Sequence, residues 1–414
     1  MLAAALDPKT TPEYHALNTV ELGIRIQPGV NPRILRRAFN GLVKRHDSLR
    51  LRLVNRHDEW MAEILDEHPT GLIVEDFGPV DLEGQAQEIQ KICAVPKTAL
   101  DEALFEMRLL KFGGHGDVVL IRAQHTIIDG YSIALMLEEL LGLVVGIPSV
   151  RPAISHGEFI AHREAGLQMR AAEKEQYWQE SLLPLPAPQK VGRYKLGLPP
   201  ASRQTMGKSV KSENILSDVT RAHLAEQAKA TGLSTFCHLH AAFAEAICEA
   251  GGGDQALFLC MLGRQDARLA GFIGAEMQAL RLKYHKGSGA AGISELISRG
   301  SDMMPSSVFD PGMPLSGLEF QFFVNMPTPM GRLRSSPFRK LFDQAFRENI
   351  KLGIFSMERV VIEDDAETEF DLQLKVSSDE GGGQASLIAD AAAWTSDDLA
   401  LIAEIMEHQV KRVS

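Results

Sequence analysis

The residues best suited to chemistry lie together in the segment Gln124–Gly130, which reads Gln-His-Thr-Ile-Ile-Asp-Gly. A neutral histidine titrates near physiological pH, so His125 can accept a proton and return it. Asp129 can brace the following turn by pairing with an arginine, and Gly130 lets the chain turn sharply and a ligand approach the backbone. The pattern predicts general-base chemistry at His125. Taken alone, it is also compatible with a structural histidine, because short motifs recur by chance.

The flanking sequence places this segment between a strand and a helix. Continuous apolar residues from Val118 to Ile121 predict a buried strand over 117–125, and apolar residues at helical spacing over 133–141 predict the helix. Nearer the N-terminus, Asn31 and Pro32 predict the start of a helix. Alternating leucine and arginine then predict a strand over 48–54 that carries Arg50.

The chain divides into two halves that each mix helices and strands. The Pro-rich stretch from Leu183 to Pro188 is stiff and marks a connector. We therefore expect an N-terminal domain over 1–182, a linker over 183–193 and a C-terminal domain over 194–414.

Composition excludes several classes of function. The 414 residues carry 43 Lys+Arg and 54 Asp+Glu, a net charge of −11. Nucleic acids and anionic membranes need a basic face, so we expect neither as a partner. No export signal is evident, which makes the cytoplasm the expected location. The sequence holds no HExxH motif, EF-hand loop or cysteine cluster, so we expect no metal and no bound cofactor.

Gln124–Gly130 resembles HHxxxDG, the signature of the condensation-domain family of nonribosomal peptide synthesis, which belongs to the chloramphenicol-acetyltransferase-like superfamily. It departs from the signature at Gln124. Further segments resemble other family motifs and occur in the same order. These are Arg45–Arg50, Ser155–Arg163, Tyr177-Trp178, Gly263-Arg264 with Ile273-Gly274, Phe320–Met326 and Glu369–Leu374.

The resemblance implies an α+β fold of two acetyltransferase-like lobes that form a V-shaped pseudo-dimer with a central tunnel. It implies a free-standing condensation enzyme of antibiotic-type biosynthesis that forms an amide or ester. The donor would be a thioester on the phosphopantetheine of a peptidyl or acyl carrier protein, or on coenzyme A. The acceptor would be a small amine or alcohol.

The resemblance also implies roles for single residues. His125 would orient or deprotonate the acceptor, and the backbone N–H of Gly130 would stabilise the oxyanion. Asp129 would pair with Arg50 to hold the loop, with Arg264 and Arg281 as rival partners. Gln124 would be structural. Three further residues are expected to shape the tunnel: Ser132, Trp178 and Asn325. Core packing is the alternative for Trp178.

Two departures from the family leave alternatives open. The opening motif of the family is absent, so we expect an N-terminus shortened by one strand or helix. The segment after Gly274 keeps little of the family pattern, which leaves the choice of substrate open. The alternatives are an acyltransferase that uses coenzyme A directly and a non-catalytic module that docks a carrier protein.

Overall fold

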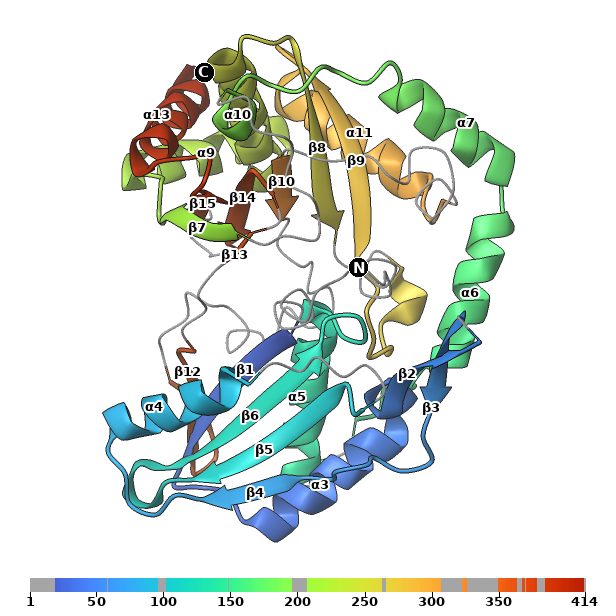
Figure 1. Ribbon diagram of the computed structural model, residues 1–414, viewed down its shortest axis with the longest axis vertical. Helices are drawn as coiled ribbons and strands as arrows, with labels where there is room; N and C mark the ends of the chain where they lie inside the picture. The colour runs from blue at the N-terminus through green and yellow to red at the C-terminus, as the bar shows by residue number, and fades with distance from the viewer. Residues whose placement is uncertain are drawn as a thin grey trace. The chain divides into compact units, whose positions relative to one another are not determined.

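The computed structural model describes residues 19–57, 59–95, 102–147, 149–195, 207–262, 266–306, 322–325, 349–362, 367–368, 370–377 and 384–412. The chain folds into two compact units. Each unit combines one large sheet with helices (Figure 1), as the α+β prediction requires. Among the described residues, none of the helices combines the length and the apolar character that a bilayer crossing requires.

The first unit is built on a six-stranded sheet in the order β11-β12-β1-β6-β5-β4. Only the β4–β5 pair is parallel. Its strands are β1 (Thr19–Gln27), β4 (Ile73–Asp76), β5 (Phe105–Lys111), β6 (Asp117–Gln124), β11 (Ile350–Leu352) and β12 (Phe355–Val360). A separate hairpin joins β2 (Leu51–Arg56) and β3 (Glu59–Ile64).

The remaining elements of this unit are helices and short 3₁₀ turns. They are α3 (Pro32–Arg45), η1 (Asp47–Arg50), α4 (Leu82–Cys93), η2 (Gly113–His115), α5 (Gly130–Val144), η3 (Ala267–Leu269) and α6 (His156–Gln168), which belongs to this unit up to His162. As predicted, α3 starts at Pro32, and the Asn31 side chain accepts a hydrogen bond from the Arg33 N–H at 2.9 Å. Helix α3 packs against α5, and their apolar side chains share one core with β1, β5 and β6.

The second unit is built on a seven-stranded mixed sheet in the order β13-β7-β15-β14-β10-β8-β9. Its strands are β7 (Gly207–Ser212), β8 (Gln255–Leu262), β9 (Gln278–His285), β10 (Phe322–Asn325), β13 (Glu367–Thr368), β14 (Leu372–Ser377) and β15 (Gln384–Asp390). Its helices are α7 (Ala171–Leu182), α8 (Gly192–Lys195), α9 (Asp218–Thr231), α10 (Thr235–Gly251), α11 (Gly289–Asp302) and α13 (Ser396–Arg412). The central helix α10 packs against α9, α11 and α13.

The units are not consecutive halves of the chain. The first unit takes residues up to His162 and adds Asp266–Glu276 and the segment that contains β11 and β12. The Pro-rich stretch expected as a linker lies within the second unit, where the side chain of Gln189 donates to the carbonyl oxygen of Gln255 and Val191 joins the core. The division differs from the prediction because β12 pairs with β1, a contact between distant parts of the sequence.

One other element differs from its prediction. The strand expected over 48–54 starts only at Leu51, because Asp47–Arg50 form a 3₁₀ turn. Ser48 and Leu49 are buried in this turn. The strand predicted over 117–125 is confirmed as β6, and all eight of its residues are buried.

A histidine lies in the apolar core of the second unit. The His240 side chain is fully buried on α10, with its ring 5.2 Å from that of Phe258 and 5.7 Å from that of Phe236. Neither ring nitrogen forms a hydrogen bond with the described residues. Burial lowers the pKa of His240 to about 3, so the ring is neutral in the folded protein at pH 7.

We expect His240 to destabilise the fold in acid. Between pH ~6.5 and the folded pKa of about 3, the unfolded state binds a proton at this residue that the folded state does not. The free energy of unfolding should therefore fall by up to about 1.4 kcal/mol for each unit that the pH drops. Urea unfolding measures the free energy of unfolding between pH 7 and 4. This free energy should fall less steeply with decreasing pH in His240→Leu than in the wild type. The exposed control variant His408→Leu should keep the wild-type slope, and an equal change in both variants would contradict the prediction.

Candidate functional site

The predicted catalytic segment forms the turn between β6 and α5. Gln124 ends β6 with its side chain fully buried, and its N–H donates to the carbonyl oxygen of Leu104 at 2.8 Å. The carbonyl oxygen of Gln124 accepts the N–H of Ile127 at 3.0 Å, which closes the turn. The strand is hydrogen-bonded to β1 and β5 on either side, so the turn starts from a fixed position.

His125 is the first residue of this turn and is partly exposed. Its Nδ1 is buried and meets no partner of standard hydrogen-bond geometry among the described residues. Burial lowers the pKa of His125, and the backbone polar groups of His125 and Ile128 and the charge of Asp129 offset part of that effect. The imidazole is therefore neutral at pH 7, the state that a general base requires.

Asp129 fixes the end of the turn. Its side chain is 2% exposed, and one carboxylate oxygen accepts the N–H of Ser132 at 2.7 Å, which caps the N-terminus of α5. The other oxygen accepts the N–H of Glu276 at 3.0 Å. One carboxylate thus joins the turn between β6 and α5 to the segment Asp266–Glu276, which is remote in the sequence.

Two further side chains of α5 hold the same segment. The hydroxyl of Ser132 donates to the carbonyl oxygen of Gly274 at 2.8 Å and accepts its N–H at 2.9 Å. The hydroxyl of Tyr131 donates to the carbonyl oxygen of Ala270 at 3.2 Å. The start of α5 therefore fixes the backbone of this segment at two more positions.

The segment is also anchored to the start of α6. The rings of Phe159 and Phe272 stack with their centroids 4.3 Å apart, and His162 Nε2 lies 2.8 Å from the carboxylate of Asp266. The sequence comparison with family motifs pointed to Ile273-Gly274 without indicating that this segment docks on α5. No local pattern could have shown it, because its partners are more than a hundred residues away.

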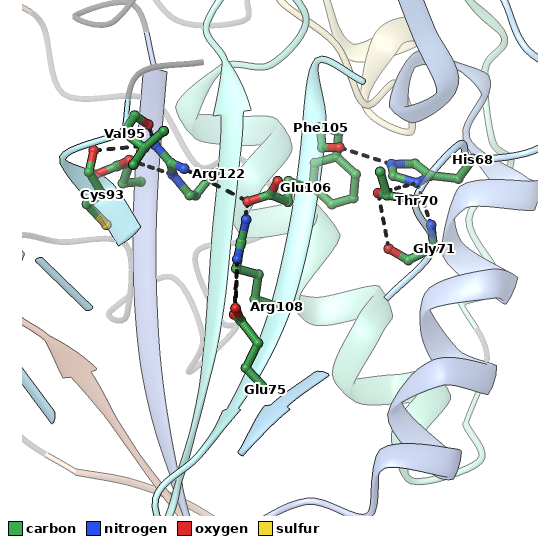
Figure 2. Close-up of polar contacts among 11 residues, drawn as sticks. His68, Thr70, Gly71, Glu75, Cys93, Val95, Phe105, Glu106, Arg108 and Arg122 are labelled. Carbon is green, nitrogen blue, oxygen red and sulfur yellow. Dashed lines mark hydrogen bonds and ion pairs between the residues drawn. The ribbon is translucent and has the colours of Figure 1, made fainter. Parts of the chain in front are cut away.

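A ladder of charged side chains supports β6 from the neighbouring strands (Figure 2). Arg108 pairs with Glu75 at 3.0 Å and with Glu106 at 2.7 Å, and Arg122 lies 3.9 Å from Glu106. Arg122 is 3% exposed and also pairs with Glu21 of β1 at 2.7 Å. The ladder links β4, β5, β6 and β1, and it reaches within two residues of Gln124.

Figure 2 also shows hydrogen bonds from two side chains, Arg122 and His68, to backbone groups in and next to the loops that connect the strands. Arg122 donates to the carbonyl oxygen of Val95 at 2.6 Å, which fixes the chain just after α4. His68 Nε2 donates to the carbonyl oxygen of Phe105 at 3.0 Å, while its Nδ1 accepts the N–H of Gly71 at 3.2 Å. These bonds define the neutral tautomer of His68 and give it a structural role.

The expected ion pair between Asp129 and Arg50 is wrong. The guanidinium of Arg50 donates instead to the carbonyl oxygens of Val43, Leu65 and Asp66, at 2.9 Å for Val43 and 3.2 Å for Asp66. The cause is the 3₁₀ turn, which directs Arg50 toward the end of α3 and the chain after β3. The rival partner Arg264 lies outside the described residues, and Arg281 belongs to β9 of the second unit.

The residues expected to shape a substrate tunnel divide into two groups. Ser132 is fully buried, and its hydroxyl both donates to the carbonyl oxygen of Gly274 and accepts the N–H of that residue. Trp178 is 1% exposed in the core of the second unit, and its Nε1 donates to the carbonyl oxygen of Met303 at 3.2 Å. The burial of Trp178 agrees with the core-packing alternative, and the tunnel role of both residues stays a prediction. The side chain of Asn325 lies outside what the structure describes, so its role stays a prediction.

Gly130 is the first residue of α5. Its N–H meets no acceptor in the described part of the chain, whereas the N–H groups of Ser132 and Ile133 are taken by Asp129. An unfilled N–H at a helix N-terminus can donate to a negative charge that develops next to it. The position thus suits the oxyanion-binding role expected for Gly130.

Comparison with known proteins gives one family. The family model of the condensation domain matches residues 12–414. Surfactin synthase subunit 2 of Bacillus subtilis (strain 168) is 27% identical over 149 residues, and the aligned part covers 36% of this chain. The same alignment covers 4% of that protein, so the chain spans a small part of its relative's length.

Two solved structures share the fold. The condensation domain from the Monacolin K polyketide synthase MokA matches with a TM-score of 0.77 at 10% identity, over 99% of this chain and 95% of that one. The epimerization domain from the third module of tyrocidine synthetase B matches with a TM-score of 0.74 at 13% identity, over 98% and 94%. These likenesses confirm the predicted α+β fold class. The expected free-standing state stays a prediction.

Because the Asp129 carboxylate accepts two backbone hydrogen bonds, its replacement should lower the free energy of unfolding. Asp129→Ala removes the cap of α5 and leaves two buried N–H groups without their acceptor, so we expect a loss of about 2–4 kcal/mol in the free energy of unfolding. The matched control is Asp81→Ala, because Asp81 caps α4 from an exposed position through one bond, to the Gly84 N–H at 2.8 Å. We expect about 1 kcal/mol there. Urea denaturation measures both, and equal losses would contradict the bridging role.

Proposed function

Because the chain belongs to the condensation-domain family, we propose that it transfers an acyl group from a thioester to a small amine or alcohol. The observation that carries the proposal is a neutral histidine, His125, at the end of a buried strand, in a turn that Asp129 holds from its far end. The donor is a thioester on the phosphopantetheine of a carrier protein. Coenzyme A thioesters are the alternative donor.

The proposed reaction uses His125 as the base. Its neutral imidazole accepts the proton of the attacking amine or alcohol, while the nitrogen or oxygen forms a bond with the thioester carbonyl carbon. The carbonyl oxygen becomes an oxyanion, to which the Gly130 N–H donates. When the carbon–sulfur bond breaks, the leaving thiolate takes the proton back from His125. The products are the amide or ester and the free thiol.

Asp129 acts in this proposal as a positioning residue. Its carboxylate accepts the N–H groups of Ser132 and Glu276, so it holds the turn rather than the substrate. Its charge also raises the pKa of His125 against the larger effect of burial. The hydrogen bonds of Asp129 fix the position of the base. The balance of burial and charge keeps the base neutral at pH 7 but still titratable.

We expect His125→Ala to lose most of its activity and keep its fold. A positioned general base contributes roughly 10²- to 10⁴-fold in rate, so product formation should fall by about that factor. The assay supplies acyl groups on carrier proteins and on coenzyme A, together with candidate amines and alcohols, and detects products by mass spectrometry. The matched control is His115→Ala, at the opposite end of β6, which should retain wild-type turnover.

Two outcomes would overturn the proposal. Wild-type turnover in His125→Ala would show that this residue is not the base. A wild-type protein that binds loaded carrier protein but forms no product would favour the docking-module alternative.

The pH profile provides a separate test of the base. Because burial lowers the pKa of His125, the base stays neutral below the ordinary histidine pKa of ~6.5, and kcat/KM should hold its plateau to below that pH before it falls. Asp129→Asn removes a charge that raises this pKa, so the acid limb should move to still lower pH. An acid limb above pH ~6.5 in the wild type would contradict a histidine base with a lowered pKa.

A further inference from the structure

The second unit carries a groove between α7, β9 and α11. Its volume is about 230 Å³. The polar side chains that line it are Tyr177, Ser181, Lys283, His285, Ser288 and Arg299, and Glu295 supplies a negative charge. Lys283 and Arg299 carry positive charges at pH 7, so the lining is net positive in a chain whose net charge is −11. We call it the cationic groove.

Lys283 is held by neutral groups. Its Nζ donates to the carbonyl oxygens of Leu183 at 3.2 Å and Pro184 at 3.4 Å. An ammonium has three donors, so one remains, and neither carbonyl neutralises its charge. Burial lowers the pKa of Lys283, which means that its positive charge is incompletely compensated in the folded protein.

Arg299 is fixed beside it on α11. Its guanidinium lies over the Tyr177 ring, 5.7 Å from the ring centroid, and pairs with Glu295 at 3.4 Å. Both partners of that ion pair are about two-thirds exposed, so it is weak and leaves guanidinium donors available. The ring contact restricts the side chain without using its N–H groups.

Hydroxyl groups complete the lining. Ser288 precedes α11, and its side chain makes no capping hydrogen bond to the helix. The first turn of α11 contains no acidic residue. Ser181 lines the groove from α7, and its hydroxyl donates to the carbonyl oxygen of Trp178 at 3.3 Å. Side chains with ammonium, guanidinium and hydroxyl groups from three different elements therefore line one groove.

We propose that the cationic groove binds the phosphate group of a phosphate ester. Lys283, Arg299 and Ser288 bring hydrogen-bond donors to one groove from β9, α11 and the residue before α11, an arrangement that suits a tetrahedral anion with three free oxygens. The volume lies below the roughly 300–1,000 Å³ of pockets that enclose whole small molecules, so the groove fits a phosphorylated end group. The inference goes beyond the proposed acyl transfer and does not depend on it.

Calorimetric titration at low ionic strength tests the site with three probes: inorganic phosphate, adenosine 3′,5′-bisphosphate and phosphopantetheine. Saturable binding of at least one probe is expected in the wild type. The two organic probes distinguish the nucleotide from the pantetheine arm as the source of the phosphate. Absence of binding by all three at millimolar concentration would overturn the proposal.

Single-residue variants locate the binding. Arg299→Gln and Lys283→Gln should each weaken it by about tenfold or more. The control is Lys286→Gln, an exposed lysine just after β9 that does not line the groove, and it should bind within about twofold of the wild type. Arg299 is largely exposed, so its variant tests the site even if Lys283→Gln fails to fold. Unchanged affinity in Arg299→Gln, or an equal loss in Lys286→Gln, would overturn the proposal.

Discussion

The first unit depends on the buried carboxylate of Asp129. It accepts two backbone N–H groups, from Ser132 and Glu276, which are 3 and 147 residues away. A charge that is 2% exposed needs hydrogen bonds such as these to be stable there. The same two bonds fix the end of the turn that carries His125, the start of α5 and the segment Asp266–Glu276. The position of His125 therefore depends on the tertiary packing of this unit.

The other end of the turn is fixed by the sheet. Strand β6 is buried along its whole length and is hydrogen-bonded to β1 and β5. The ladder from Glu75 to Arg122 adds charged contacts across four strands and reaches the last residues before Gln124. The His125 side chain, on a turn that is fixed at both ends, loses little orientational freedom when a ligand binds. Burial then sets its protonation state.

Several residues whose types suggest chemistry are buried within the fold. Trp178 fills the core of the second unit, and His240 lies among its aromatic side chains as a neutral ring. Ser132 uses its hydroxyl to hold Gly274. In contrast, the cationic groove contains Lys283 and Arg299, whose charges remain incompletely matched by their neighbours. Burial and hydrogen-bond partners, more than residue type, thus determine which polar side chains are already used by the fold.

The sequence by itself determined the local features around the site. The apolar run of β6, the helix that follows it, and the order of His125, Asp129 and Gly130 depend on periodicity and spacing within about 30 residues. The family resemblance rested on that order and is confirmed. Only the tertiary structure decided what Arg50 and Asp129 contact, because their candidate partners are chemically equivalent in the sequence. It also placed Asp266–Glu276 and β12 with the first unit, since contacts between residues more than a hundred positions apart leave no local pattern.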